Sequence, residues 1–103
     1  MTAIQKQIAD QINSNNVVVY SKSYCPYCTR AKSELAKIIP SDMSVLILEL
    51  DNMDDGSNIQ NHLLELTGQR SVPNIFINKK HVGGCDDLLA KIKNGQIKSL
   101  LSN

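Results

Sequence analysis

Apolar residues recur at every fourth position near the start of the chain, at Ile4, Ile8 and Ile12. That spacing is typical of an amphipathic helix, which we expect from Thr2 to about Asn13. The next apolar segment, Val17-Val18-Val19-Tyr20, is continuous and rich in β-branched residues. A run of this kind predicts a strand that is covered on both faces.

A second helix and strand follow. The helical stripe after Pro26 consists of Cys28, Ala31, Leu35 and Ile38 or Ile39, and Pro40 closes it. The segment Val45–Leu50 predicts a second buried strand. Because a helix lies between the two strands, we expect a βαβ unit with a parallel pair.

The last third of the chain predicts a helix, a hairpin and a final helix. The first of these helices carries Ile59, Leu63 and Leu66 on its apolar face and ends at Gly68. Asn74–Ile77 and Lys80–Val82 are expected to pair around Asn78-Lys79, and the final helix is expected to be capped by Asp86 or Asp87 and interrupted at Gly95. The element order predicts an α/β fold with a four-stranded mixed sheet flanked by helices.

Length and composition narrow the functional classes. The 103 residues suit one domain, which we place at residues 1–103, and a net charge of +1 gives no support for nucleic-acid binding. The N-terminus lacks a secretory pattern, and the apolar runs are too short for a membrane span. Three cysteines make a poor disulfide scaffold, so a reducing compartment, the cytoplasm with the nucleus also open, is expected.

The candidate chemistry lies in Cys25-Pro26-Tyr27-Cys28, between the first strand and the second helix. At a helix N-terminus, unpaired backbone N–H groups stabilise an anion, so we expect Cys25 to have a lowered pKa and to be the nucleophile. Lys22 could add positive charge. Cys28 lies one turn further on the apolar stripe and is expected to be the buried resolving thiol. A zinc site completed by His81 and Cys85 is a weaker alternative, and no metal is expected.

Three motifs in order resemble the glutaredoxin family. These are the segment from Lys22 to Cys28, the segment from Thr67 to Ile77 with Val72-Pro73, and the segment from His81 to Leu88 with Gly83-Gly84. The resemblance implies a thioredoxin-like fold and a glutathione-dependent thiol–disulfide oxidoreductase with no permanently bound cofactor. Its substrates would be glutathionylated and disulfide-containing proteins, with glutathione as co-substrate, and it would act as a monomer.

The resemblance also implies a glutathione site. Lys22 and Gln60 would hold the glycine carboxylate, and Tyr27 would line the groove beside Cys25. Val72 would pair through its backbone with the cysteinyl part, next to a cis Pro73. Asp86, with the backbone around Cys85, would bind the γ-glutamyl group, and Arg70 could add positive charge.

One alternative within the family remains. Some glutaredoxins bind an iron–sulfur cluster between two subunits, through the first cysteine and glutathione. Pro26 argues against this role here because it stiffens the turn at the sulfur.

Overall fold

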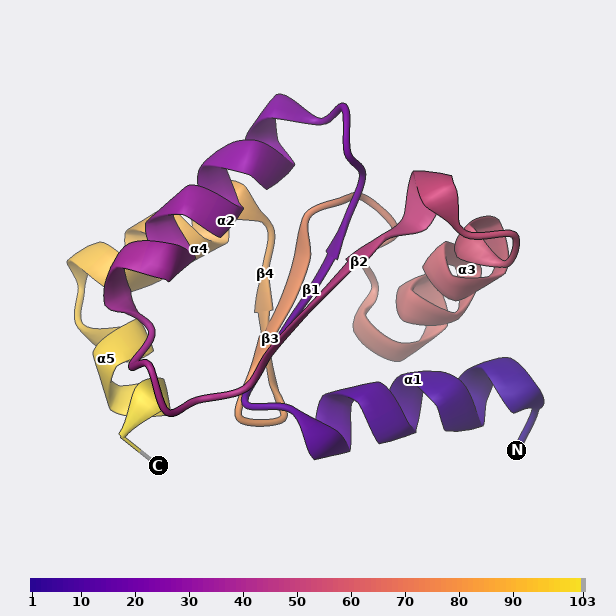
Figure 1. Ribbon diagram of the computed structural model, residues 1–103, viewed down its shortest axis with the longest axis horizontal. Helices are drawn as coiled ribbons and strands as arrows, with labels where there is room; N and C mark the ends of the chain where they lie inside the picture. Colours follow the sequence, from indigo (N-terminus) through magenta and orange to yellow (C-terminus); the bar gives the residue numbers. More distant parts are fainter. Residues whose placement is uncertain (103) are drawn as a thin grey trace.

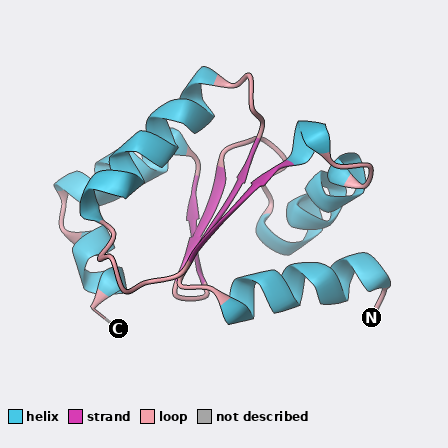
Figure 2. Cartoon of the chain, viewed as in Figure 1, coloured by secondary structure: helices cyan, strands magenta, loops and turns pink. Residues whose placement is uncertain are grey.

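The computed structural model describes residues 1–102, which form four strands and five α-helices with one short 3-10 turn (Figures 1 and 2). In chain order, the elements are α1 (Ala3–Ser14), β1 (Val17–Ser21), α2 (Pro26–Ile38), β2 (Val45–Glu49), η1 (Leu50–Asn52), α3 (Gly56–Thr67), β3 (Asn74–Ile77), β4 (Lys80–Gly83), α4 (Cys85–Lys93) and α5 (Gln96–Leu101). The predicted order of helices and strands is therefore confirmed, and the break at Gly95 separates α4 from α5.

The four strands form one mixed sheet in the order β2-β1-β3-β4. β1 runs parallel to β2 and antiparallel to β3, and β3 and β4 form the expected hairpin. Asn78 and Lys79 both have positive φ in the turn, as a two-residue hairpin loop requires. The fold is the predicted βαβ unit followed by a hairpin.

Helices cover both faces of the sheet (Figure 1). α2, α4 and α5 pack on one face, over a core that includes Val17, Val19 and Leu88. α1 and α3 pack on the other face, over a core that includes Val18 and Tyr20. Alternate residues of β1 therefore enter opposite cores, which explains why its first four residues are apolar and why all five of its residues are buried.

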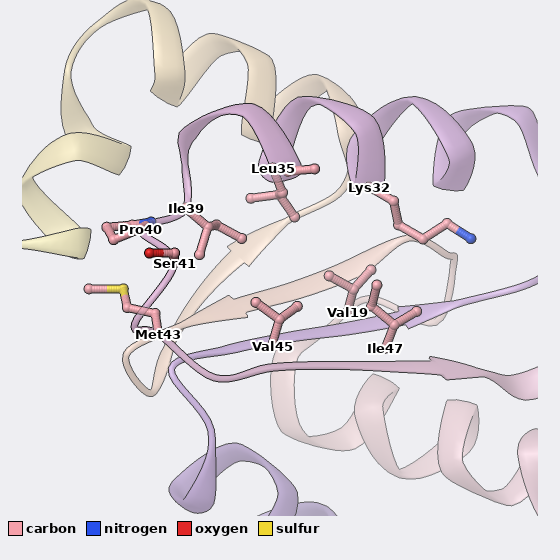
Figure 3. Close-up of a pocket in the computed structure, with 10 residues that line it drawn as sticks. Val19, Lys32, Leu35, Ile39, Pro40, Ser41, Met43, Val45 and Ile47 are labelled. Carbon is pink, nitrogen blue, oxygen red and sulfur yellow. The ribbon is translucent and has the colours of Figure 1, made fainter.

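β2 differs from the prediction because it is an edge strand. Val45 and Ile47 are 43% and 44% exposed, although the apolar run predicted burial. Their side chains line a groove of about 290 Å³ between β2 and α2, with Leu35 and Lys32 on the helix side (Figure 3). An apolar run alone does not distinguish a central strand from an edge strand, because only the pairing order decides which strand has two neighbours.

α3 shows a second difference. Ile59 and Leu63 are buried as predicted, but Leu66 is 53% exposed, and the buried Gln60 lies on the inward face instead. Gly68 ends the helix in the left-handed conformation, with φ of 81°, as expected. Within residues 1–102, no helix has the length and apolar character needed to cross a membrane.

Candidate active site

Cys25 is the N-cap residue of α2, immediately before Pro26 at the first helical position. Its backbone is extended, and its sulfur accepts a hydrogen bond from the Cys28 N–H at 3.3 Å. The Cys25 side chain is partly exposed, whereas Cys28 is completely buried. The predicted difference in exposure between the two sulfurs is therefore confirmed.

This environment gives the two thiols different acidities. Partial burial alone would raise the pKa of Cys25, but hydrogen bonds from the Cys28 side chain and from the N–H groups of Cys28 and Tyr27, with the charge of Lys32, lower it overall. Burial, followed by the hydrogen bond to Cys25, raises the pKa of Cys28. These opposite pKa shifts favour the thiolate form at Cys25 over Cys28.

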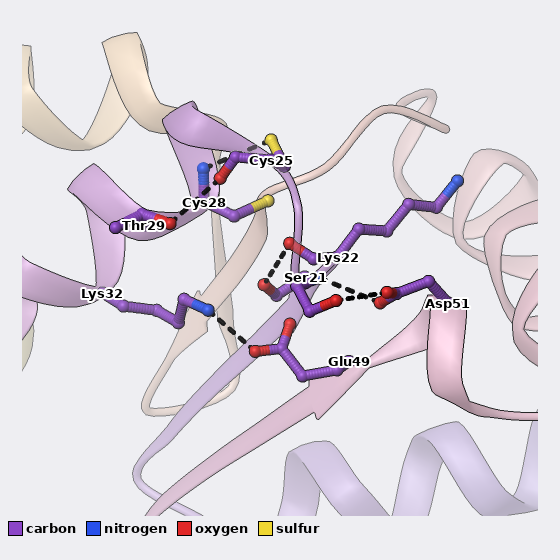
Figure 4. Close-up of polar contacts among 9 residues, drawn as sticks. Ser21, Lys22, Cys25, Cys28, Thr29, Lys32, Glu49 and Asp51 are labelled. Carbon is purple, nitrogen blue, oxygen red and sulfur yellow. Dashed lines mark hydrogen bonds and ion pairs between the residues drawn. The ribbon is translucent and has the colours of Figure 1, made fainter.

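The cation that acts on Cys25 is Lys32 rather than Lys22. Lys32 lies seven residues after Cys25 on α2, whereas the Lys22 side chain extends away from both sulfurs, towards α3 (Figure 4). Lys32 also pairs with Glu49 of β2 at 2.7 Å. Two turns of helix bring Lys32 back to the side of the cysteines, and this spacing is the signal in the sequence that could have identified it.

Asp51 fixes the loop that leads to Cys25. Its carboxylate accepts hydrogen bonds from the Ser23 N–H, at 2.9 Å, and from the Ser23 hydroxyl (Figure 4). These bonds from Ser23, with the charge of Lys22, hold the pKa of Asp51 below its usual range. The loop is thereby tied to η1, at the end of the neighbouring strand.

A groove of about 300 Å³ lies beside Cys25, between the loop that precedes β3 and the start of α4. It is lined by Tyr27, Gln69, Ser71, Val72, Pro73, Gly84, Cys85, Asp86 and Asp87. Five of the predicted site residues are therefore brought together here. Lys22 and Gln60 are not part of its lining.

The wall formed by Val72 and Pro73 carries a cis peptide bond, as predicted. The Cys25 thiol lies 4.0 Å from the carbonyl oxygen of Val72, so the start of α2 and the Val72–Pro73 wall meet at the sulfur. Gln69, a residue that the sequence did not single out, holds this wall. Its amide nitrogen donates to the carbonyls of Ser71 and Pro73, each at 3.0 Å.

Asp87, one of the two predicted residues, caps the start of α4. Gly84 is the N-cap residue, and its N–H donates to the carboxylate of Asp87 at 3.0 Å. Asp87 is therefore occupied by the helix, whereas Asp86 is exposed beside the groove. Cys85 is only 5% exposed and, like the other two cysteines, is not in a disulfide.

Gln60 and Arg70 lie on the α3 side of the loop. The buried Gln60 amide donates to the backbone oxygen of Arg70 at 3.0 Å. The Arg70 side chain lies along α3, bonded to Asn61 at 2.9 Å and to Ser57 at 3.3 Å. Arg70 is not part of the groove lining.

The four residues considered for a zinc site are not assembled. His81 is exposed, and its ring packs against Phe76, a residue of the core under α1 and α3. Its Nε2 lies 2.8 Å from Asn74. Cys85 belongs to the opposite core. Among residues 1–102, no three His, Cys, Asp or Glu side chains are grouped as metal ligands.

A scan of protein-family models matches residues 17–82 to glutaredoxin. The chain belongs to the glutaredoxin family. Among curated glutaredoxins, it is 50% identical to one from Ricinus communis over 88% of this chain and 86% of that protein. It is 45% identical to glutaredoxin-1 of Saccharomyces cerevisiae over 93% of this chain and 88% of that protein. The buckwheat glutaredoxin–glutathione complex superposes with a TM-score of 0.88 and 40% identity, over 96% of this chain and 87% of that one.

Membership in this family gives the activity. Glutaredoxins are glutathione-dependent thiol–disulfide oxidoreductases, and this chain is one of them. Its thioredoxin-like fold agrees with the solved glutaredoxin structures. The comparisons favour the oxidoreductase over the iron–sulfur carrier.

Proposed function

We propose that this glutaredoxin reduces protein–glutathione mixed disulfides and protein disulfides, with Cys25 as nucleophile and Cys28 as resolving thiol. The observation that carries the proposal is the position of the Cys25 sulfur. It lies at the N-terminus of α2 and 4.0 Å from the Val72 oxygen, at one end of the groove. A thiolate in this position is both stabilised and open to a peptide disulfide bound beside it.

The groove would hold the glutathione part of the substrate. The backbone of Val72, exposed by the cis Pro73, would pair with the cysteinyl unit, and Tyr27 would form the wall beside the sulfur. Asp86 would bind the γ-glutamyl ammonium, and the backbone N–H groups around Cys85, in the first turn of α4, would bind its carboxylate.

Lys22 and Gln60 would extend the site beyond the groove, on the α3 side. The Lys22 ammonium would attract the glycine carboxylate of glutathione. The Gln60 amide nitrogen has two hydrogens, and Arg70 accepts one of them in this structure. The second hydrogen would bind the same carboxylate.

The reaction would begin with attack of the Cys25 thiolate on a glutathionylated protein. The protein leaves as a thiol, and glutathione remains on Cys25. A second glutathione then releases glutathione disulfide and restores Cys25. With a protein disulfide, Cys28 would attack the mixed disulfide at Cys25 and release the protein as a dithiol. Two glutathiones would then reduce the Cys25–Cys28 bond.

The enzyme would act as a monomer in the cytoplasm or nucleus. Residues 1–103 would form one domain without a permanently bound cofactor. Every residue of the proposed site would come from one chain.

Two variants test the division of roles. Cys25→Ser is expected to abolish reduction of a glutathionylated peptide, because the stabilised thiolate is lost. Cys28→Ser is expected to retain this activity and to lose reduction of protein disulfides. Appreciable peptide reduction by Cys25→Ser, or none by Cys28→Ser, would contradict the proposal.

A further inference from the structure

Two residues lie side by side at the ends of β1 and β2, beneath the cysteines. Ser21 and Glu49 are partners in the parallel register, on the face of the sheet that α2 covers. Ser21 is completely buried, and its hydroxyl makes a long contact of 3.5 Å with the backbone oxygen of Lys22. Such a contact is weak, so little opposes rotation of this hydroxyl towards another acceptor.

Glu49 offers such an acceptor. One of its oxygens binds Lys32 at 2.7 Å, while the other, Oε1, is buried and has no hydrogen-bond partner in the described part of the chain. A buried oxygen without a partner is rare and is often explained by function. Burial would raise the pKa of Glu49, but Lys32 and Ser21 lower it overall, so the carboxylate is charged at neutral pH.

Ser21 lies between this carboxylate and the resolving thiol (Figure 4). Its hydroxyl favours the charged form of Cys28 as well as that of Glu49. One O–H cannot serve both acceptors fully. The carboxylate is charged throughout the reaction, whereas Cys28 is a neutral thiol until it attacks, so the hydroxyl is drawn to Glu49.

The elements packed around Cys28 each contribute charged or titratable groups. Cys25 and Lys32 come from α2, Glu49 from β2 and Asp51 from η1, while Cys85 of α4 lies on the side of Cys25. Lys32 and Glu49 oppose each other in this set. Removal of either one leaves the other's charge uncompensated beneath the sulfurs.

We propose that Glu49 is a positioning residue that, through Ser21, delays the attack of Cys28 on the Cys25–glutathione disulfide. In this step Cys28 loses its proton to solvent, and its sulfur bonds to that of Cys25. The Cys25–glutathione bond breaks, and glutathione leaves with the electron pair and takes up a proton. The Cys28 sulfur is oxidised from thiol to disulfide and the glutathionyl sulfur is reduced to a thiol, while the Cys25 sulfur stays in a disulfide throughout.

The delay has a consequence for specificity. While Cys28 waits, a second glutathione can reduce the Cys25 adduct directly. Glu49 therefore sets the share of turnovers that pass through the internal disulfide. This inference rests on the proposed roles of Cys25 and Cys28.

The experiment measures ring closure in single turnovers. Each reduced protein is mixed with one equivalent of glutathione disulfide at pH 7.5 and quenched with acid, and intact mass follows the adduct and the internal disulfide. Glu49→Gln is expected to close the ring about three- to tenfold faster, the effect of half to one unit in the pKa of Cys28. Lys32→Met and Ser21→Ala are each expected to slow ring closure.

If the Lys32–Glu49 pair were merely structural, loss of either partner would not change the rate of ring closure in opposite directions. Glu34→Gln, which breaks the comparable pair with Lys37 elsewhere on α2, serves as the control and is expected to leave closure unchanged. Slower or unchanged closure in Glu49→Gln overturns the inference. If that variant does not fold, unchanged or faster closure in Lys32→Met and Ser21→Ala overturns it. Glutathione attached elsewhere than at Cys25 in the unmodified protein would instead contradict the proposed function.

Discussion

Gly83, next to the groove beside Cys25, is the position where one added carbon should disturb the site most. Its φ is 116°, and a Cβ built there would lie 2.3 Å from the Asp87 carboxylate that caps α4. Gly83→Ala therefore combines backbone strain of about 1–3 kcal/mol with displacement of a helix cap worth about 0.5–2 kcal/mol. We expect a loss of about 2–4 kcal/mol in the free energy of unfolding, or about 10–20 °C in Tm.

Two other glycines separate these effects. Gly68 also has positive φ, but a Cβ there would meet nothing within 4 Å, so Gly68→Ala should cost only the backbone strain, about 1–2 kcal/mol. Gly84 has φ of −93°, and its Cβ would make an ordinary contact of 3.6 Å with the Pro73 oxygen. Gly84→Ala should therefore leave stability within about 1 kcal/mol of the unmodified protein.

Urea unfolding followed by circular dichroism measures all three variants. The KM for glutathione should also rise in Gly83→Ala, because the displaced Asp87 lines the groove. The reasoning is refuted if Gly83→Ala is no less stable than Gly68→Ala.

Two further predictions concern α3 and the loop before Cys25. Leu63→Ala should destabilise the protein by about 2–5 kcal/mol because Leu63 is 1% exposed, while Leu66→Ala, at 53% exposure, should cost under about 0.5 kcal/mol; equal losses in chemical unfolding would contradict the assigned helix face. The pKa of Asp51 is lowered in the folded state, so its stabilising effect is present above the ordinary carboxyl pKa of about 4 and is lost as pH falls through the lower folded value. Unfolding measured from pH 6 to pH 2 should thus show a smaller acid-induced loss in Asp51→Asn than in the unmodified protein, and identical pH profiles would count against the Ser23–Asp51 contact.

Much of the fold could be predicted because local patterns determine it. The four-residue spacing of Ile4, Ile8 and Ile12 predicted α1, and the uniform β-branched run predicted the central strand β1. The burial of β2 was predicted wrongly, since an edge position depends on which strands pair and not on the strand's own residues.

The site, like the fold, could be predicted only in part from the sequence. The unequal exposure of Cys25 and Cys28 could be predicted from the helix stripe. The Lys32–Glu49 pair could not, because it forms only when α2 and β2 pack together. Gln69 was not singled out, because its bonds to Ser71 and Pro73 depend on the conformation of an irregular loop. Glu49 was part of a predicted strand, and only the register with Ser21 places it beneath the thiols.

The central claim is that glutathione attached to Cys25 occupies the groove between the Val72–Pro73 wall and the start of α4. The most direct test is an NMR comparison of the Cys28→Ser protein before and after glutathionylation, with intermolecular contacts measured to the bound glutathione. The account predicts contacts with Tyr27, Val72 and Asp86. Contacts along the exposed Val45 and Ile47 of β2 instead, or glutathione attached to Cys85, would contradict it.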